Sequence, residues 1–420
     1  MSNASDILSE PVNIVSKVPS NWIKKNLVEL CNPKQWKTIS KQEMSKTGYP
    51  VFGANGFIGY YPEYNHDNET IAITCRGATC GTVNLVPKKT YITGNSMCLD
   101  NVSRDTDVKY LYYASSYRTL SDVISGSAQP QITGESLKFV ILPIPPITEQ
   151  KKIASILTSV DELIENTQKQ IDKLQDLKKA TINELLTRGI SHTEFQDSKL
   201  LTRGISHTEF IVSKLGRIPK GWKIVSLFSL SKIIKRGPSL SCNTEGKGIR
   251  YITSGNLVRD EVSLEGDYKF LDNFYDIEKC RILENDLVLN CVNSAAKIGG
   301  SAVFSLNIDA IVGFNNYAIT LNTDVCDPDF IHYFTKTHLF RHQLGLVIKE
   351  AINQVSFSTK DLDLIQIALP SKSEQSEISQ NIDSIWKNEK TLMKKLTQTQ
   401  SLKKSLMQGL LTGKLRVQLN

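Results

Sequence analysis

Cysteine and histidine are the residue types in this chain that could bind a metal ion, and their spacing argues against it. Cys75 and Cys80 are the closest pair of the eight cysteines, but no CxxC occurs and no nearby histidine completes a zinc site. His338 and His342 stand four apart on an expected helix, without the glutamate of an HExxH motif. We therefore predict reduced, partly buried thiols, a solvated helix face at the histidines, and no metal site.

Composition places the chain among globular proteins with several domains. It has 420 residues, 50 Lys and Arg against 43 Asp and Glu, and a formal net charge of +7. That length suggests two to three domains. No apolar run approaches a membrane span, and the N-terminal residues lack the pattern of a secretory signal, so we expect a cytoplasmic location. Residues 374–420 hold eight basic and four acidic residues. This basic segment is expected to meet either a DNA backbone or an acidic partner surface.

The most informative feature is an internal duplication. The Pro-x-x-Trp segment that ends at Trp22 recurs at Trp222, an offset of 200. The pair Glu149-Gln150 recurs as Glu374-Gln375, an offset of 225. Two units of about 190 residues, each with a variable part and a similar tail, account for the length.

The two tails are predicted to be long helices. Apolar residues follow a period near 3.5, which is typical of a coiled coil. An intramolecular pair of such helices would run antiparallel and separate the two variable parts. The alternative is that each helix packs only on its own domain. The expected seam consists of Ile153, Leu157, Val160, Ile164, Ile171, Leu174 and Leu177, and of Ile378, Ile382, Ile385, Leu392, Leu396 and Leu402, with polar Glu389 and Thr399 interrupting it.

The variable parts are predicted to be mixed, with many short strands. Residues 49–60 and 71–83 have the pattern of strands joined by tight turns, and residues 286–290 and 300–304 flank a polar loop. Helices are expected near 108–123 and 329–347. Glycines at 53, 56 and 59 lack the Gly-Lys-Ser/Thr ending of a phosphate loop, so we interpret them as turn residues.

A second, shorter duplication lies between the units. Residues 185–199 and 200–214 are identical at thirteen of fifteen positions. As continuous helix, fifteen residues would add roughly 22 Å. Because Gly189 and Gly204 make continuous helix unfavourable, our hypothesis is that the extra copy forms a loop or changes the spacing only slightly.

Together these motifs resemble the specificity (S) subunit of type I restriction–modification systems. The resemblance rests on Gln129-Pro-Gln-Ile-Thr133, on the segment from Leu137 through Pro145-Pro146 to Leu157, and on the second Pro-x-x-Trp. It covers the chain from about Val18 to Val417. The family usually has one connector before that second motif, so the duplicated connector is a departure from it.

The resemblance implies an α+β fold with two mixed target recognition domains, separated by two long antiparallel coiled-coil helices with pseudo-twofold symmetry. The implied division is an N-terminal tail (1–17), recognition domain 1 (18–147), spacer helix 1 (148–188), the duplicated connector (189–216), recognition domain 2 (217–372) and spacer helix 2 (373–420).

The resemblance also implies a non-catalytic role. Each domain would read one half of a bipartite double-stranded DNA target, while the helices set the gap and dock two modification (methyltransferase) subunits. Restriction subunits would join them, and S-adenosylmethionine would bind the modification subunits, leaving this chain without a cofactor. Residues 327–330 come nearest to a methyltransferase tetrad but lack its second proline. The alternatives are a free two-headed DNA-binding regulator and an enzyme with a divergent site.

Polar, basic and aromatic residues in glycine-broken loops are the candidate DNA contacts. Arg76 and Lys297 stand in comparable strand–turn segments and could contact phosphate or guanine, or be solvated loop charges. The repeated Gln129 and Gln354 are expected to be structural. The DNA-binding candidates are Lys46, Tyr49, Asn55, Tyr60, Arg76, Lys88 and Gln131 in the first domain, and Arg236, Ser254, Asn256, Asn293, Ser294, Lys297 and Asn315 in the second.

Overall fold

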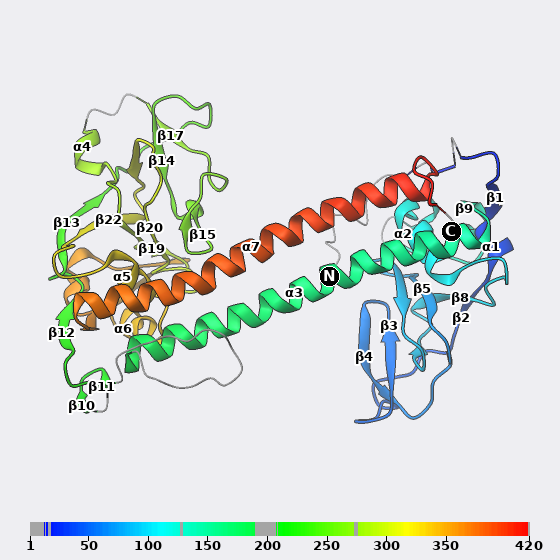
Figure 1. Ribbon diagram of the computed structural model, residues 1–420, viewed down its shortest axis with the longest axis horizontal. Coiled ribbons are helices and arrows are strands. Elements are labelled where there is room, and N and C mark those ends of the chain that lie inside the picture. The colour runs from blue at the N-terminus through cyan, green and yellow to red at the C-terminus, as the bar shows by residue number, and fades with distance from the viewer. Residues whose placement is uncertain are drawn as a thin grey trace. The chain divides into compact units, whose positions relative to one another are not determined.

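The computed structural model describes residues 12, 14–15, 18–126, 129–189, 207, 209–272 and 276–418. The chain divides into two compact units (Figure 1). Unit 1 comprises Met1–Lys169 and Met393–Asn420, and unit 2 comprises Gln170–Leu392. Each unit thus takes part of each long helix. No helix in these described ranges has the length and apolar character needed to cross a membrane.

Unit 1 contains three antiparallel or mixed sheets. Their strand orders are β2-β8-β5-β6, β4-β3-β7 and β1-β9. The strands are β1 (Ile23–Asn26), β2 (Asn32–Gln35), β3 (Tyr49–Gly53), β4 (Gly56–Tyr61), β5 (Thr70–Thr74), β6 (Val83–Val86), β7 (Tyr91–Ile92), β8 (Ser96–Asp100) and β9 (Ile141–Ile144). The helices are α1 (Leu27–Leu30), α2 (Val108–Arg118), the first part of α3 (Ile147–Arg188) and the last part of α7 (Lys372–Leu411), with 3-10 turns at Ser121–Val123 and Ser136–Phe139.

Unit 2 is larger but uses the same plan. Its strand orders are β13-β22-β18-β20-β16-β15, β17-β14-β21, β19-β24-β23, β12-β25 and β10-β11. The strands are β10 (Phe210–Ser213), β11 (Gly216–Pro219), β12 (Lys223–Ser226), β13 (Ser231–Arg236), β14 (Ile249–Ile252), β15 (Leu257–Val258), β16 (Glu261–Val262), β17 (Phe270–Leu271), β18 (Leu287–Asn290), β19 (Val292–Asn293), β20 (Ser301–Val303), β21 (Ala310–Val312), β22 (Asn316–Leu321), β23 (Lys349–Ala351), β24 (Gln354–Ser356) and β25 (Gln366–Leu369). The remaining helices are α4 (Ile277–Cys280), α5 (Pro328–Phe334) and α6 (His338–Val347), with 3-10 turns at Ser254–Asn256 and Thr359–Asp363.

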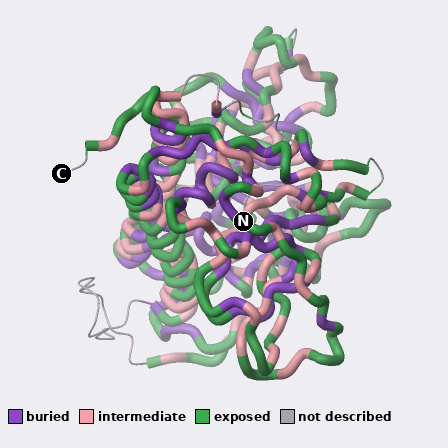
Figure 2. Tube along the Cα trace, turned by 90° about the vertical axis from the view of Figure 1, so that its right-hand side faces the viewer, coloured by how far each residue is buried: buried purple, intermediate pink, exposed green. Residues whose placement is uncertain are grey.

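The duplication seen in the sequence is also a duplication of topology. The order β2-β8-β5-β6 in unit 1 corresponds to β13-β22-β18-β20 in unit 2, and the pair β1-β9 corresponds to β12-β25. The central strands β5 and β18 are almost wholly buried, and their apolar residues need no alternation because both faces are covered. The predicted strands and the predicted helical segments are confirmed. Figure 2 shows the buried stretches of the trace inside the molecule and exposed stretches on the outer turns.

The long helices α3 and α7 pair antiparallel within each unit, as predicted. In unit 1, Asp161 of α3 forms an ion pair with Lys403 of α7, and Glu149 pairs with Arg416 just beyond α7. Rising numbers on one helix therefore meet falling numbers on the other. In unit 2, apolar residues of both helices belong to one core cluster, and these are Ile182, Leu186, Ile378 and Ile382.

The buried seam of these helices departs from the prediction at two places. Leu177 and Leu402 are 43% and 52% exposed, so they lie outside the seam. Seven-residue steps along a helix return to the same face. One step from Ile171 reaches Lys178 and not Leu177, and two steps from Ile385 reach Thr399 and not Leu402. Residues at such seven-residue intervals that are buried although polar are Thr167, Glu389 and Thr399. The prediction chose the seam residues by their hydrophobicity, whereas the position of a residue on the helix decides whether its side chain faces the partner helix.

A polar layer in unit 2 explains why Glu389 is tolerated in the seam, whereas Thr167 and Thr399 of unit 1 donate to main-chain carbonyls of their own helices. Gln175 donates a hydrogen bond to Glu389 Oε1 (2.9 Å), and Lys178 Nζ lies 3.5 Å from Glu389 Oε2. Lys178 Nζ also lies 2.8 Å from Asp260 Oδ2 in the turn between β15 and β16. Polar groups paired across a helical seam stabilise one register over others, because any slip leaves them without partners.

Each long helix begins with the repeated Glu-Gln pair, and the glutamine is fully buried. Gln150 Nε2 donates to the carbonyls of Asp105 (2.9 Å) and Pro145 (2.8 Å), and Asp107 N donates to Gln150 Oε1 (2.8 Å). The corresponding Gln375 donates to Val325 O (3.2 Å) and Pro370 O (3.0 Å) and accepts from Asp327 N (2.8 Å). One side chain thus satisfies three main-chain groups at the junction of sheet and helix in each unit.

The helix α5 brings three carboxylates of unit 2 close together, and this has a consequence for stability. Burial, followed by the charges of Asp383 and Asp327, raises the pKa of Asp329 to about 6. Above that pH its carboxylate destabilises the fold, and this cost disappears as the pH falls toward the ordinary value of 3.8. We expect Asp329→Asn to stabilise unit 2 by about 1–2 kcal/mol at pH 8. Denaturant unfolding at pH 8 and pH 4 measures this.

The matched control for this prediction is Asp324→Asn. The Asp324 side chain is 83% exposed, so its substitution is expected to change stability little at either pH. An Asp329→Asn variant whose gain is the same at pH 4 and pH 8 would contradict the assignment.

Candidate nucleic-acid interface

Three segments meet beside the central strand of each unit and form what we call the turn frame. In unit 1 the segments are residues 75–81, 93–96 and 129–132. In unit 2 they are residues 291–299, 313–316 and 354–357. The first segment follows the central strand, β5 or β18, and the second precedes β8 or β22. Turns that project from a packed sheet are suited to reach the edges of bases.

Two main-chain hydrogen bonds occur at corresponding positions in the turn frame of each unit. Cys75 N donates to Asn95 O (3.1 Å), and Ile132 N donates to Cys75 O (3.0 Å). In unit 2, Cys291 N donates to Asn315 O (2.8 Å), and Phe357 N donates to Cys291 O (3.2 Å). Both frames therefore have these two hydrogen bonds in common, although the first segment is longer in unit 2 and the exposed side chains differ.

A glycine at the end of the first segment closes each frame. Gly81 and Gly299 have φ of +90° and +74°, where residues with a side chain are strained. Gly81 N donates to Thr74 O (2.8 Å) and Gly299 N to Asn290 O (2.9 Å). A Cβ at Gly299 would lie 2.4 Å from Leu344 Cδ2, so a larger residue would also force the buried Leu344 side chain to move.

A side chain from the edge strand supports the second segment of each frame. Gln35 Nε2 donates to Gly94 O (2.9 Å), and Arg236 Nε donates to Phe314 O (2.7 Å). The Arg236 guanidinium also lies 4.1 Å from the centre of the Phe314 ring. Arg236 is a predicted DNA contact, and these contacts give it a supporting role in the frame.

The structure brings together three of the predicted contacts in unit 1. Arg76 forms a β-bridge with Gln131, and Thr79 of the same turn donates a hydrogen bond to Asn55. All three predicted residues are exposed. The other predicted residues lie elsewhere: Lys46, Tyr49 and Tyr60 at the far end of the β3–β4 hairpin, and Lys88 at the far end of β6.

In unit 2 the predicted contacts form two groups. Asn293, Ser294 and Lys297 lie in the first segment of the frame, where Ser294 and Lys297 are exposed and Asn293 is half-buried. Ser254 and Asn315 line a second feature, a cavity of about 360 Å³ that also includes Asp267, Lys269 and Phe314. Polar groups thus surround an open hollow next to the frame.

Asn256 does not fit the prediction. Its side chain is fully buried, and Nδ2 donates to Ser263 O and Asp267 O, both at 2.9 Å. Its Oδ1 accepts from Thr253 N at 2.9 Å. The amide is therefore committed to holding a turn and cannot face DNA. The sequence showed a polar residue next to glycine, but burial depends on the strands that pack around it.

Two exposed residues were missed by the sequence reasoning. Asn95 occupies in unit 1 the place of Asn315 in unit 2, and an alignment of residues 93–95 with 313–315 would have indicated it. Phe57 on β4 is 60% exposed and packs edge-on against Tyr60 at 5.1 Å. An aromatic residue next to a glycine-rich turn was the available signal.

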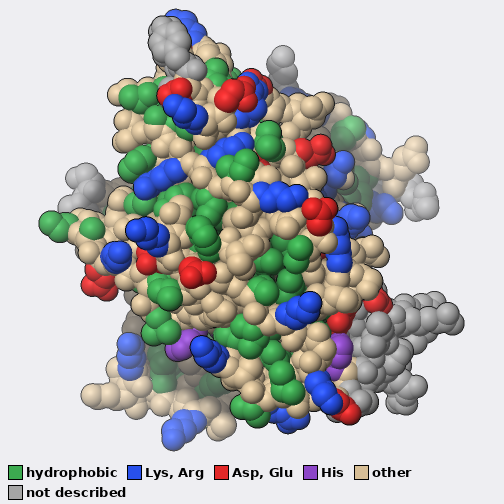
Figure 3. All heavy atoms as spheres, turned by 90° about the vertical axis from the view of Figure 1, so that its left-hand side faces the viewer, with side chains coloured by type: hydrophobic (Ala, Val, Ile, Leu, Met, Phe, Trp, Pro, Cys, Tyr) green, Lys and Arg blue, Asp and Glu red, His purple; other side chains and the backbone are tan. Residues whose placement is uncertain are grey.

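Figure 3 shows one face, on which Lys and Arg side chains are interspersed with apolar and acidic ones. A face of this kind offers no bulk positive charge to a polyanion, so binding there depends on individual contacts.

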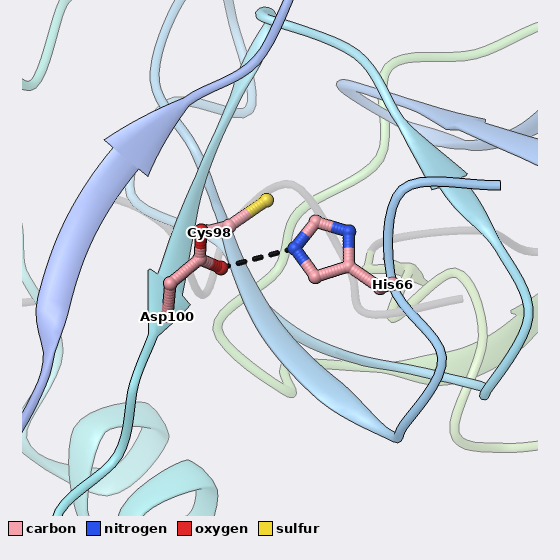
Figure 4. A group of neighbouring side chains, drawn as sticks. All are labelled: His66, Cys98 and Asp100. Carbon is pink, nitrogen blue, oxygen red and sulfur yellow. Dashed lines mark hydrogen bonds and ion pairs between the residues drawn. The ribbon is translucent and has the colours of Figure 1, made fainter.

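One group of side chains in unit 1 has the residue types of a metal site (Figure 4). The ligand atoms of His66, Cys98 and Asp100 lie within 4.8 Å of one another. His66 Nε2 lies 3.0 Å from Asp100 Oδ1, and its Nδ1 lies 2.7 Å from Asn65 Oδ1. Asp100 Oδ2 accepts from Trp36 Nε1 (3.1 Å). Both ring nitrogens and both carboxylate oxygens are therefore engaged, and we assign this group to the support of β8.

The cysteines of the turn frame are structural. Burial raises the pKa of Cys80 and of Cys291 to about 11, so both are thiols at neutral pH. Cys75 Sγ accepts from Gln35 Nε2 (2.9 Å) and donates to Asn95 O (3.1 Å). His338 and His342 lie on an exposed face of α6.

Comparison with known families identifies this duplicated arrangement. The model of the type I restriction modification DNA specificity domain matches residues 19–176 and again residues 219–400. The chain belongs to this family. The specificity domain occurs twice, and its two matches follow the two repeats.

Named relatives and solved structures agree with the family. The type I restriction enzyme MjaVIII specificity subunit of Methanocaldococcus jannaschii is 26% identical over 350 residues, which are 81% of this chain and 78% of that protein. The putative MjaX specificity subunit of the same organism is 29% identical over 69% of this chain but only 62% of its own length. A crystal structure of the type I S subunit from M. genitalium covers 98% of this chain and 100% of that one, with a TM-score of 0.64 and 17% identity. The last likeness shows a shared fold.

Proposed function

We propose that this chain is the non-catalytic, DNA-reading subunit of a type I restriction–modification enzyme. Each turn frame reads one half of a bipartite double-stranded DNA target. The observation that carries this proposal is the pair of turn frames with corresponding main-chain hydrogen bonds and different exposed side chains. A common support with variable side chains fits two readers of different half-sites.

The helices α3 and α7 are proposed to set the gap between the half-sites and to dock two modification subunits, joined by restriction subunits. Methyl transfer and S-adenosylmethionine binding are assigned to the modification subunits, and DNA cleavage to the restriction subunits, so this chain itself needs no cofactor. Family membership supports this proposal over a free two-headed regulator, because the matched domain is named for specificity within restriction–modification systems.

Methylation mapping tests the proposal. The chain is expressed with its modification subunits, and methylated bases are read across the host genome. We expect Arg76→Ala to weaken discrimination by about 10- to 100-fold at a position in one half-site only, since a good side chain–base pair contributes ~1–3 kcal/mol. Lys297→Ala is expected to affect the other half-site only.

Lys24→Ala is the control, because Lys24 is exposed, is not a predicted DNA contact, and lies on β1, outside the sheet that carries the turn frame. It is expected to leave both half-sites unchanged. Variants of a single frame that alter both half-sites, or methylation by the chain without any partner, would overturn the proposal.

A further inference from the structure

Two buried glutamates have matching surroundings that the sites above do not use. Glu149 and Trp22 form one pair in unit 1, with Trp22 Nε1 donating to Glu149 Oε2 at 3.1 Å. Glu374 and Trp222 form the other pair in unit 2, with Trp222 Nε1 3.2 Å from Glu374 Oε2. All four side chains are buried. We call the two groups the first and second Trp–Glu clusters.

A third, basic residue completes each cluster, and it comes from the segment that follows the antiparallel partner helix. In unit 1, Arg416 beyond α7 binds Glu149 through Nε (2.8 Å) and Nη2 (3.1 Å). In unit 2, His207 beyond α3 places Nε2 2.7 Å from Glu374 Oε1. A buried carboxylate without such a partner is costly, so the cluster favours the arrangement that brings its third member in.

The helix ends are part of the same clusters. Gly413 follows α7 and Gly189 follows α3, with φ of +73° and +75°, the conformation that ends a helix. A Cβ at Gly413 would lie 2.3 Å from Pro19 Cδ, next to Trp22. A Cβ at Gly189 would lie 2.5 Å from His207 Cδ2 and 2.9 Å from Glu374 Oε1. Each helix therefore ends against the Trp–Glu cluster at the start of the other helix.

The spacing of glycine and basic residue differs between the clusters by one connector copy. Arg416 is the third residue after Gly413, whereas His207 is the eighteenth after Gly189. The excess of fifteen is the length of the duplicated connector, whose extra residues lie outside the described ranges. The chain leaves the described part after Gly189 and returns at His207, whose ring lies against Gly189.

We propose that the Trp–Glu clusters, and not the length of the connector, fix where α3 ends against α7, so that the second connector copy has no effect on the half-site gap. His207 and Arg416 are the positioning residues of this arrangement. The statement about the gap rests on the function proposed above, whereas the statement about the helix ends concerns the chain alone.

Deletion of residues 190–204 tests both statements. It leaves Gly189-Ile205-Ser206-His207, which restores the three-residue spacing of the first cluster. In methylation mapping with the modification subunits, we expect the same half-sites separated by the same gap. A gap altered by even one base pair would overturn the proposal.

Hydrogen exchange of the isolated chain tests the clusters without DNA. We expect the deletion to leave amide exchange of residues 185–189 within about twofold of the parent, because the helix end keeps its partners. In the deletion background, His207→Ala is expected to raise exchange there by about tenfold. His207→Arg is expected to restore protection, because arginine performs this task in the first cluster.

Arg416→Ala is the matched variant in unit 1. It is expected to raise exchange at residues 410–413 and to leave residues 185–189 unchanged. If the deletion itself raises exchange at residues 185–189, or if His207→Ala leaves exchange unchanged, the proposal is wrong. An unchanged exchange pattern together with no methylation at all would overturn the proposed function and spare the clusters.

Discussion

Replacing Gln150 by leucine is expected to destabilise unit 1 by about 4 kcal/mol, although leucine fills a similar volume. The reason is that Gln150 binds three main-chain groups, the carbonyls of Asp105 and Pro145 and the amide of Asp107. Each buried group left without a partner costs ~1–3 kcal/mol. Denaturant unfolding of the full chain, read through hydrogen exchange of unit 1 segments, measures the loss.

Gln170→Leu is the matched control, because Gln170 lies on the same helix with an exposed side chain. It is expected to change stability by less than about 0.5 kcal/mol. Gln375→Leu is expected to destabilise unit 2 as Gln150→Leu destabilises unit 1. If Gln150→Leu costs no more than Gln170→Leu, the three hydrogen bonds do not hold the junction of sheet and helix.

Asp260→Asn is expected to cost unit 2 about 2–3 kcal/mol at pH 7. Asp260 Oδ2 lies 2.8 Å from Lys178 Nζ, and its Oδ1 lies 2.9 Å from Lys336 Nζ. The lysine side chains are only 15% and 20% exposed, so removing their shared counter-charge leaves Lys336 without this carboxylate partner and Lys178 with Glu389 alone. Asp260 has φ of +66°, and asparagine accepts this conformation, so the variant removes charge without adding backbone strain.

The pH dependence of this variant gives a second readout. Burial alone would raise the pKa of Asp260, but Lys336 and Lys178 outweigh it and hold the pKa below the ordinary value of 3.8. The stability that the carboxylate contributes is therefore present above pH 3.8 and is lost as the pH falls below it. The difference in the free energy of unfolding between the parent and Asp260→Asn should accordingly become smaller below about pH 4. Asp276→Asn, an exposed carboxylate of unit 2, is the control. A stability difference that does not change with pH across this range would show that the loss in Asp260→Asn does not come from the missing charge.

Much of the fold was predictable because repetition and periodicity survive in the sequence. The offsets between Trp22 and Trp222 and between Gln150 and Gln375 indicated two units, and those residues occupy equivalent places in the structure. The antiparallel pairing of α3 and α7 followed from the repeat and from the apolar period. Leu177 and Leu402 were misplaced because hydrophobicity alone cannot separate neighbouring helix positions when polar residues, such as Lys178 and Glu389, pair inside the seam.

The candidate interface was predictable in part. Arg76, Asn55 and Gln131 converge as expected of glycine-broken loops, and Lys297 lies in the turn that corresponds to that of Arg76. The prediction that Asn256 contacts DNA was wrong, because asparagine can either contact bases or hold a turn. Only the burial of the side chain distinguishes these two roles. The family, the duplication and the order of elements could be predicted without coordinates, since they depend on patterns along the chain. The tertiary structure decided which polar side chains face solvent, and it showed that His207 and Arg416 do the same work, because such contacts join residues that no local pattern connects.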